Sequence, residues 1–417
     1  MDRVEEKFWN SLLRHRWTIF TVCATVMSLY ARYMFRDFIS NDMKQFLIPW
    51  YDTIKELGGF SGLGTQVGNY QISYQTLIAL MTYLPIDKVH AYKLLSVIFD
   101  YALGISAAMV VRQITGRREK AALTYIIIAL LPITIQNSAA WGQCDSIFTF
   151  FLVMTFLLLV KKKDAWAMIC FGTAFAFKMQ AIFFLPFLLF YYVWSKNFSW
   201  RLFLLIPVPM LLLSVGGLIQ GRSLLEPFEI YIGQTDQYRR ISMNYPSFWN
   251  MVVGDKAKTI YSEMHTLSLS VTVALLAGMM IFLFNQKRMG GKAMLMTATA
   301  MMYTCVLFLP AMHERYSYPV LIFAIIACLL ESRMILPSLG MLIIDLQTYT
   351  RFLIEREPPS WLFLVVLNIV CYLGIVYLTW KNTGLSQSEA SAKEPGPDSE
   401  PPYAPEITET AGDNVKL

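Results

Sequence analysis

The sequence predicts an all-α polytopic membrane protein with about twelve transmembrane helices. Hydrophobic residues make up 56% of the 417 residues, and runs such as 122–131, 147–160 and 181–193 carry almost no charge. A helix needs about 20 apolar residues to cross a bilayer, and only helices and closed barrels satisfy their backbone hydrogen bonds there. The runs are too long and too uniformly apolar for barrel strands, so we expect helices throughout.

The apolar runs divide the chain into three parts. Residues 1–16 form an amino-terminal segment, 17–380 a membrane domain, and 381–417 an acidic tail rich in Ser, Glu, Pro and Gly that is expected to be disordered. The expected spans are residues 17–35, 91–111, 121–135, 145–160, 165–178, 181–194, 202–219, 266–284, 293–309, 319–330, 334–349 and 361–380. The short fifth and sixth spans require helices that are tilted or packed among neighbours.

Basic residues orient these spans. Lys and Arg cluster in residues 1–16, 112–120 and 161–163 and recur after every second span. With twelve spans they all fall on one face, which the positive-inside rule makes cytoplasmic, together with the tail. The opposite face carries two long loops, the first and fourth external ones, at 36–90 and 220–265. Because the charges lie singly in short loops, the net charge of +6 does not indicate a nucleic-acid partner.

The first external loop contains the main candidate for a catalytic group. Asp42 follows the first span and precedes residues 44–57, which we expect to form an amphipathic helix at the membrane interface. A carboxylate at the membrane edge can act as general base for a hydroxyl if its surroundings hold its pKa near the working pH. Asp37 is either a second acidic ligand or a helix cap, and Tyr70 follows a glycine-rich break. The alternative for Asp42 is an ordinary interfacial charge.

Two further polar groups interrupt the apolar runs. Trp141 and Gln143 form an unusual end for a lipid-facing helix and are expected to contact ligand, whereas Asp145 either joins them or caps the next helix. Lys178 and Gln180 lie within a long apolar run. At the bilayer centre a lysine costs about 2.5–3.5 kcal/mol, but between two short helices it would lie at the outer surface. Either position directs Lys178 toward an external pocket for an anion.

Cationic residues gather in the later external loops. His313 and Arg315 lie between two apolar spans, where Arg315 could neutralise a phosphate or simply pair with Glu314. Other loop residues that complete the set are Arg239, Arg240, Asn244 and Arg351. For these four the alternatives are an interfacial anchor or a solvated loop. Together with Asp42 and Lys178, the cations would suit a lipid-linked phosphate beside one acidic base.

No metal site or disulfide framework is visible in the sequence. The six cysteines are scattered, and five of them fall inside apolar runs. Asp37 and Asp42 could recruit a divalent ion, but one carboxylate and a phosphate leaving group do not require one. We therefore expect that no cofactor is required and leave a divalent metal open.

Five motifs, in order, resemble the GT-C superfamily of polytopic glycosyltransferases that use polyprenyl-phosphate sugars. The resemblance covers about residues 17–330. Within this superfamily, the chain resembles the branch that contains bacterial mannosyltransferase-like proteins and the dolichyl-phosphate-glucose-dependent enzymes of N-glycan assembly. The motifs are Asn41-Asp42-Met43 followed by Pro-Trp-Tyr, Trp141-Gly-Gln-Cys-Asp145-Ser, Phe177-Lys178-Met-Gln180, Ser242-Met-Asn244-Tyr-Pro-Ser-Phe-Trp249 and Met312-His-Glu-Arg-Tyr316. Many relatives have Gly and Tyr where this chain has Asn41 and Met43, and prolines where it has Tyr70-Gln-Ile-Ser-Tyr74.

This resemblance implies a site and a reaction. The acidic residue of the first external loop would be the catalytic base, which maps onto Asp42. Lys178, His313 and Arg315 would lie near the donor phosphate, and positive charge there would replace the general acid of a glycosidase during an inverting transfer. The other residues assigned to donor binding are Gln180, Arg239, Arg240 and Arg351, and those assigned to the substrate pocket are Trp141, Gln143, Asp145, Tyr70 and Asn244.

We therefore expect a membrane glycosyltransferase that moves a mannose- or glucose-like hexose from a polyprenyl-phosphate donor to an extracytoplasmic glycan, lipid-linked or protein acceptor. It would span the plasma membrane many times, with its active site on the outer face, and serve the assembly of cell-envelope polysaccharide. The alternative is a lipid-linked sugar flippase that makes no bond. A transporter often carries internal repeats and broken helices at mid-membrane, and no repeat is visible here. An assembly partner without activity is a third interpretation.

Overall fold

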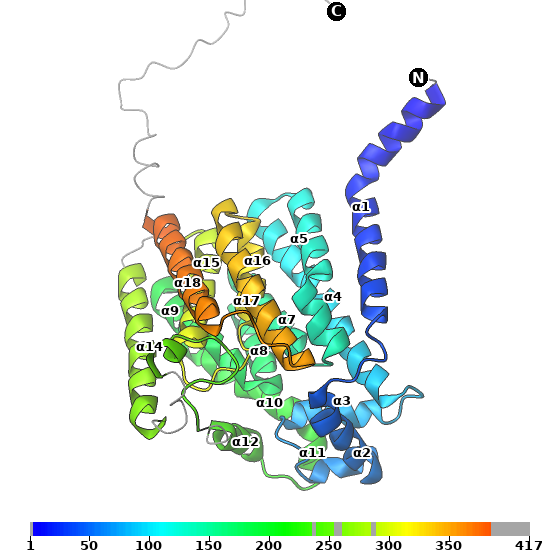
Figure 1. Ribbon diagram of the computed structural model, residues 1–417, viewed down its shortest axis with the longest axis vertical. Coiled ribbons are helices and arrows are strands. Elements are labelled where there is room, and N and C mark those ends of the chain that lie inside the picture. The colour runs from blue at the N-terminus through cyan, green and yellow to red at the C-terminus, as the bar shows by residue number, and fades with distance from the viewer. Residues whose placement is uncertain (1–2, 236–238, 254–260, 285–288, 385–417) are drawn as a thin grey trace, which may run out of the picture.

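The structure is a computed structural model that describes residues 3–235, 239–253, 261–284 and 289–384. Every regular element within these ranges is helical (Figure 1). Each of the twelve segments expected to span the membrane contains a helix, and the segment 145–160 coincides with α7 (Asp145–Val160). The predicted tail lies outside the described residues from position 385 onward.

The first half of the bundle is organised around α4 (Lys88–Thr115). The Asp87 carboxylate caps its first turn by accepting a hydrogen bond from the Val89 N–H at 2.9 Å, and Gly116 ends it in a left-handed conformation with φ +69°. Helices α5 and α7 pack against α4, α1 packs against α5, and α8 packs against α7. Their bounds are α1 (Arg3–Tyr33), α5 (Arg118–Leu130), α6 (Pro132–Ile135) and α8 (Asp164–Phe177).

A buried ion pair joins α1 to α4. The Arg32 guanidinium donates a hydrogen bond to Asp100 Oδ2 at 2.8 Å, and Ser138 Oγ donates to the same oxygen at 2.5 Å. Separating such a pair would leave an uncompensated buried charge, so it holds the carboxyl-terminal part of α1 in place. The helix begins at Arg3, so residues 3–16 of the predicted amino-terminal segment belong to the first helix, and this part projects beyond the bundle (Figure 1).

The second half is organised around α15 (Gly291–Phe308), whose side chains are almost all buried and which packs against α14, α16 and α18. The bounds of the other helices in this half are α9 (Leu185–Ser195), α10 (Pro207–Leu213), α13 (Trp249–Val253), α14 (Tyr261–Phe284), α16 (Tyr318–Cys328), α17 (Ile335–Ile354) and α18 (Trp361–Gly384). Shorter helical turns are η1 (Met43–Leu47), η2 (Gly59–Gly64), η3 (Gln136–Ala140), η4 (Met179–Phe184), η5 (Trp200–Leu205) and η7 (Ser332–Met334).

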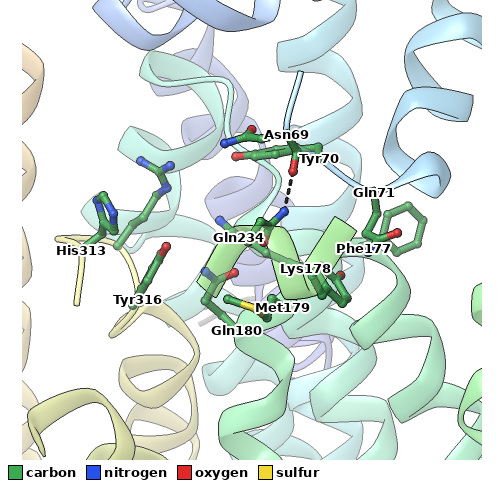
Figure 2. Close-up of a pocket in the computed structure, with 12 residues that line it drawn as sticks. Asn69, Tyr70, Gln71, Phe177, Lys178, Met179, Gln180, Gln234, His313 and Tyr316 are labelled. Carbon is green, nitrogen blue, oxygen red and sulfur yellow. Dashed lines mark hydrogen bonds between the residues drawn. The ribbon is translucent and has the colours of Figure 1, made fainter. Parts of the chain in front are cut away.

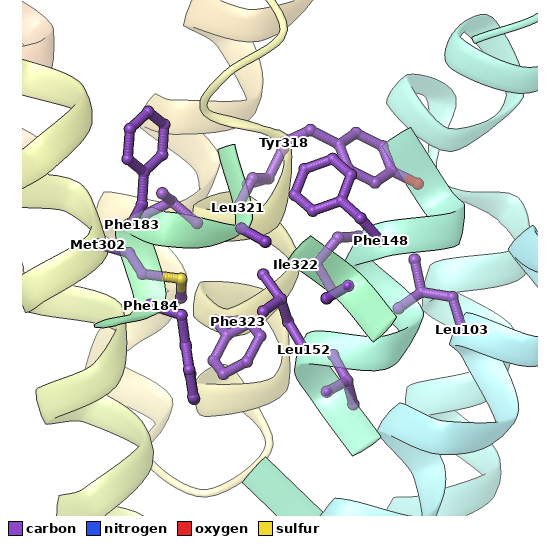
Figure 3. Packing of buried hydrophobic residues seen from close by; sticks show 14 of the residues in the cluster. Leu103, Phe148, Leu152, Phe183, Phe184, Met302, Tyr318, Leu321, Ile322 and Phe323 are labelled. Carbon is purple, nitrogen blue, oxygen red and sulfur yellow. The ribbon is translucent and has the colours of Figure 1, made fainter. Parts of the chain in front are cut away.

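The two halves meet in one apolar core. Figure 3 shows Phe148 and Leu152 of α7 facing Ile322 and Phe323 of α16, with Met302 of α15 beside them. Each of these side chains is at most 1% exposed. Close packing of this kind fixes the start of α7 relative to the start of α16. This matters for the site described below, because α7 begins beside it and α16 follows the His-Glu-Arg segment.

Short helices from the two long loops and from the end of the predicted span 202–219 form a cluster at the end of the bundle opposite the amino terminus (Figure 1). We call it the external helix cluster; its members are α2 (Ile48–Glu56), α3 (Ile72–Met81), α11 (Val215–Ile219) and α12 (Glu226–Thr235). The helix expected over 44–57 is present as η1 and α2. Its Tyr51 is only 4% exposed and packs edge-on against Tyr92, with ring centroids 6.4 Å apart, so this ring faces the protein. Helix α3 was not predicted.

The structure does not confirm a count of twelve membrane spans. Among the described residues, four helices, α4, α14, α15 and α18, are long and apolar enough to cross a membrane, and the bent pair 118–130 and 132–140 adds a fifth if it counts as one span. Other apolar helices are shorter: α7 has 16 residues and α8 has 14. At 1.5 Å per residue these reach about 24 and 21 Å, less than the roughly 30 Å of a hydrocarbon core. An apolar run in the sequence therefore does not by itself show that the segment crosses the membrane.

Candidate active site

A polar turn after α1 places Asp42 against the end of the bundle opposite the amino terminus. Ser40 Oγ accepts a hydrogen bond from the Met43 N–H at 3.2 Å and donates one to the Trp141 carbonyl at 3.3 Å. Met43 is fully buried against Gly142, which has φ +73°; a Cβ at Gly142 would lie 3.2 Å from Met43 Sδ. These contacts fix the loop that carries Asp42 on the turn that follows η3.

Three side chains bind one oxygen of the Asp42 carboxylate. Asp42 Oδ2 accepts hydrogen bonds from Trp141 Nε1 at 2.9 Å, from Gln143 Nε2 at 3.1 Å and from Arg315 Nη1 at 3.3 Å. Within the described part of the chain, Oδ1 accepts none. The Asp42 side chain is 13% exposed. One oxygen is thus used to position the group, and the other retains its lone pairs for a ligand.

Trp141 supports this carboxylate from behind. Its side chain is 0% exposed; the ring stacks on Phe352 with centroids 4.7 Å apart and lies edge-on to Tyr349 at 5.0 Å. The Arg315 guanidinium carbon lies 5.2 Å from the centre of the indole ring, within range of a cation–π interaction. Trp141 was expected to contact ligand, but in the structure it contacts Asp42 and Arg315 and lines none of the cavities described below.

Asp145 and Lys178 form a buried ion pair beside this group. Asp145 Oδ1 accepts a hydrogen bond from Lys178 Nζ, and Asp145 Oδ2 accepts one from Asn137 Nδ2 at 2.9 Å. Arg315 Nε lies 4.0 Å from the same Oδ2. Asp145 is 1% and Lys178 7% exposed. Asp145 therefore orients both cations, and it provides no side-chain cap for the helix α7 that it begins.

The break at Lys178 decides between the two positions considered for this lysine. Its backbone is extended, with φ −153° and ψ 131°, between the end of α8 and the short turn η4. The long apolar run is therefore two short helices, and Lys178 lies where they meet. A lysine at such a break avoids the interior of a single long helix and points with Gln180 into a cavity.

Arg315 joins the two carboxylates on either side of it. Besides Asp42, its Nη1 contacts Glu314 Oε1 at 3.1 Å, and Glu314 is completely buried. The structural Glu314–Arg315 pair is present, yet the same guanidinium also reaches Asp42. Such shared hydrogen bonds from one planar group fix geometry better than a point charge could.

His313 differs from its cationic neighbours. Burial, together with the positive charges of Arg315 and Lys178, lowers the pKa of its imidazole to about 3. The imidazole is therefore neutral at physiological pH, and it offers hydrogen bonds to a ligand without adding charge. Tyr70, opposite it, donates a hydrogen bond to Gln143 Oε1 at 3.2 Å, and burial raises the pKa of its hydroxyl well above the usual value.

Three adjoining cavities surround these groups. The central cavity, of about 280 Å³, is lined by Asp42, Tyr70, Gln143, Asn244, His313 and Arg315 among others. The lysine cavity, of about 80 Å³, shares Asn69, Tyr70, His313 and Arg315 with it and continues to Lys178, Gln180 and Gln234 (Figure 2). The third, which we call the α17 cleft, is about 370 Å³ in volume and shares Asp42, Gln45, Asn244 and Phe352 with the central cavity.

Comparison with known proteins assigns this arrangement to a family. Residues 69–310 match the sequence model of Glycosyltransferase family 87. The chain belongs to glycosyltransferase family 87. This is a GT-C-type family of polytopic membrane glycosyltransferases, as the sequence motifs predicted. No curated protein matches the chain.

The family 87 match covers only part of the site. It includes Tyr70, the Trp141–Gln143 turn and Lys178, whereas Asp42 and Arg315 lie outside the matched residues. Because Asp42 contacts Trp141, Gln143 and Arg315 directly, the fold nevertheless brings the parts inside and outside the match into one site. Together with the long apolar helices, the match identifies a multi-pass membrane glycosyltransferase.

Some predicted residues of this glycosyltransferase do not join the site. Asp37 is exposed, pairs with Arg36 at 3.1 Å and lies 3.6 Å from His90, and it lines none of the three cavities. Arg239 is exposed and Arg240 partly exposed, and neither lines these cavities. Arg351 does line the α17 cleft, but Glu357 binds it through two hydrogen bonds of 2.8 and 3.0 Å.

Other site residues were not predicted. Gln45 lies one turn after Asp42 in the helical segment, a spacing that could have revealed it. Asn137, Gln234 and Phe352 carry no signal of their own in the sequence, because their roles depend on contacts between distant segments. Gln234, for example, donates a hydrogen bond to the Asn69 carbonyl and thereby brings α12 to the lysine cavity (Figure 2).

The described residues contain no group of three or more His, Cys, Asp or Glu side chains placed to hold a metal ion. Asp37 and Asp42, which were considered as a pair, lie in different surroundings. The expectation that no cofactor is required remains a prediction.

Proposed function

We propose that this family 87 protein is an inverting glycosyltransferase that moves a hexose from a polyprenyl-phosphate donor to a hydroxyl of an extracytoplasmic acceptor. The proposal rests mainly on one observation: the Asp42 carboxylate lines a cavity that is continuous with the one lined by Lys178 and Arg315. A base on one side and two cations on the other match the charges of such a reaction.

The chemical step follows from these positions. Asp42 Oδ1 accepts the proton of the acceptor hydroxyl as the oxygen attacks the anomeric carbon of the donor. The bond between that carbon and the phosphate oxygen breaks, and its electron pair leaves with the polyprenyl phosphate. Arg315 and Lys178 stabilise the charge that develops on the phosphate, so a separate general acid is not needed. Attack from the face opposite the leaving group inverts the configuration.

Buried carboxylates prepare the cations for this role. Asp145 holds Lys178, and Glu314 holds Arg315, and neither carboxylate lines the lysine cavity. Groups already oriented before the donor binds need little reorganisation during the reaction. The neutral His313, with Gln180 and Gln234, would complete the hydrogen bonds to phosphate and sugar.

The wider setting belongs to the same proposal. The external helix cluster and the three cavities are built from loops that the distribution of basic residues places outside the cytoplasm. We propose the plasma membrane as the location and a surface glycan, a lipid-linked sugar or a protein as the acceptor, with the mannose- or glucose-like hexose taken up from the outer leaflet. No metal ion enters the mechanism.

The test compares wild type with Asp42→Asn in liposomes that contain radiolabelled undecaprenyl-phosphate hexoses. We expect the wild type to transfer label to an acceptor extract and the variant to be slower by about 100-fold or more, because general-base catalysis contributes about 10²–10⁴. Donor binding should change little. Wild-type turnover in the variant would refute the role of Asp42. Label that crosses the bilayer equally in both proteins, without a new bond, would support a flippase.

A further inference from the structure

The α17 cleft lies next to Asp42 and is separate from the lysine cavity. It is formed where the carboxyl-terminal end of α17 faces the segment that carries Asn41 and Asp42, and none of its lining residues also lines the lysine cavity. The central cavity connects the two through Asp42 and Gln45 on one side and Arg315 on the other. Asp42 can therefore meet ligands from two directions.

The two outer cavities differ in charge. Lys178 and Arg315 line the lysine cavity, and no carboxylate in the described residues does. The α17 cleft is lined by the carboxylates of Asp42, Glu355 and Glu357 and by one cation, Arg351. Glu357 binds that cation through both of its oxygens, and the guanidinium carbon of Arg351 lies 5.0 Å from the Trp361 ring. With three carboxylates and one cation, the lining of the α17 cleft is net negative.

The remaining lining of the α17 cleft is polar without charge. It consists of the amides of Asn41, Gln45 and Asn244, the Thr348 hydroxyl and the Phe352 ring. Asn41 Nδ2 donates a hydrogen bond to Glu355 Oε1 at 3.3 Å across the cleft. Amides and hydroxyls can donate to and accept from sugar hydroxyls, carboxylates accept from them, and an aromatic ring can cover the apolar face of a sugar.

We propose that the α17 cleft binds the acceptor, and that this acceptor is an uncharged, hydroxyl-rich sugar at the position of attack. This inference rests on the proposed function and adds the acceptor class to it. The carboxylates of Glu355 and Glu357 repel a phosphorylated or otherwise anionic acceptor, while the donor phosphate is drawn to the lysine cavity. Repulsion of the wrong ligand is a common source of specificity.

The size of this selection follows from the exposure of the carboxylates. Glu357 is 71% exposed, so solvent and salt screen its charge. We expect an uncharged sugar to bind about 5- to 10-fold more tightly than its phosphate at about 0.01 M salt, where the Debye length is about 30 Å. At about 1 M salt, with a Debye length of about 3 Å, the difference should nearly vanish.

The experiment measures binding and needs no turnover. Full-length protein in nanodiscs that contain saturating undecaprenyl phosphate, added to fill the lysine cavity, is dialysed against tritiated butyl mannoside or its 6-phosphate. Empty nanodiscs of the same lipid composition are the blank. The double variant Glu355→Gln/Glu357→Gln removes two charges at the cleft. Its matched control, Glu56→Gln/Glu229→Gln, removes two charges from exposed side chains that line none of the three cavities. Selection should be lost in the first variant and retained in the second.

The outcomes separate this inference from the proposed function. Binding of the phosphate as tight as that of the uncharged sugar, selection unchanged in Glu355→Gln/Glu357→Gln, or binding of neither probe would overturn the assignment of the cleft. Selective binding without any hexose transfer in the liposome assay would instead leave the cleft as a sugar site and refute the transferase. Hexose transfer without selective binding would instead support the transferase and refute the assignment of the α17 cleft.

Discussion

At the scale of single residues, charge in the site is arranged in two layers. Lys178 and Arg315 line the cavities, and behind them Asp145 and Glu314 are buried and make hydrogen bonds to them. A cation buried without such a partner would lose part of its charge or move toward water. The paired arrangement holds both cations in place while leaving their outer faces to a ligand.

This arrangement predicts a strong coupling between Asp145 and Lys178. Asp145→Asn and Lys178→Met should each lower the melting temperature, because removing one partner of a buried pair costs about 3–5 kcal/mol. The double variant removes both charges and should be more stable than the sum of the single effects predicts. Thermal unfolding of the four proteins in the same detergent measures this. Additive effects would show that the two side chains do not act as a pair.

The sequence anticipated much of the chemistry at this scale and less of the geometry. Asp42, Gln143, Lys178 and Arg315 do converge, because each interrupts an apolar run at the same end of the bundle. Arg239 and Arg240 lie in an equally polar loop but do not reach the cavities. A loop residue is carried to a site by the contacts of its segment, and composition does not show them.

At the scale of elements, the site depends on a helix that stops early. The pair α5 and α6–η3 bends by 47° at Pro132, and the turn after η3 presents Trp141 and Gln143 to Asp42. Proline breaks a helix because it lacks an N–H and clashes with the preceding turn. Gly142 then allows the left-handed backbone, with φ +73°, that the turn requires.

Gly142→Ala tests this element. An alanine in the left-handed region costs about 1–2 kcal/mol, and its Cβ would crowd buried Met43. We expect a lower melting temperature and a loss of about 10-fold in kcat/KM, since a shift of about 1 Å at a catalytic group can have larger effects. Gly278→Ala in α14 is the control, because no atom lies within 4 Å of its added Cβ. Equal effects of both substitutions would argue that the turn has no special role.

Helices were easier to predict than spans. The periodic and apolar signals located each of the twelve segments, as α7 and α8 illustrate. These signals did not show that α8 ends next to Lys178, which forms a buried ion pair with Asp145. They also did not show that α3 folds within a loop. Both features depend on partners distant in the sequence. The length of an apolar run in the sequence does not show how deeply the helix that it forms lies in the bilayer.

At the scale of the whole molecule, the protein has two unlike ends. The external helix cluster and the cavities lie at one end, and the projecting part of α1 lies toward the other (Figure 1). Helix α7 runs between them, from Asp145 at the site to the lysines at 161–163. From the positive-inside rule we expect the lysine end to be cytoplasmic.

This polarity can be tested with single cysteines in a background whose six native cysteines are replaced by alanine. A membrane-impermeant maleimide added to intact cells should label Ser61→Cys in η2, which packs against the external helix cluster, and should not label Lys162→Cys. Both positions are exposed, so access to reagent decides the result. Permeabilised cells should label both. Labelling of Lys162→Cys alone from outside would reverse the orientation and place the site in the cytoplasm.

The shortness of α7 and α8 has a consequence for how a lipid substrate is reached. Helices of about 24 and 21 Å fall short of a hydrocarbon core of roughly 30 Å, so the bilayer thins beside them or their outer ends lie below the headgroups. Asp145 and Lys178 are at these ends. The polyprenyl-phosphate donor proposed above, anchored in the outer leaflet, would then present its phosphate to them sideways with its tail still among lipids. The work of extracting a long hydrocarbon into water would be avoided.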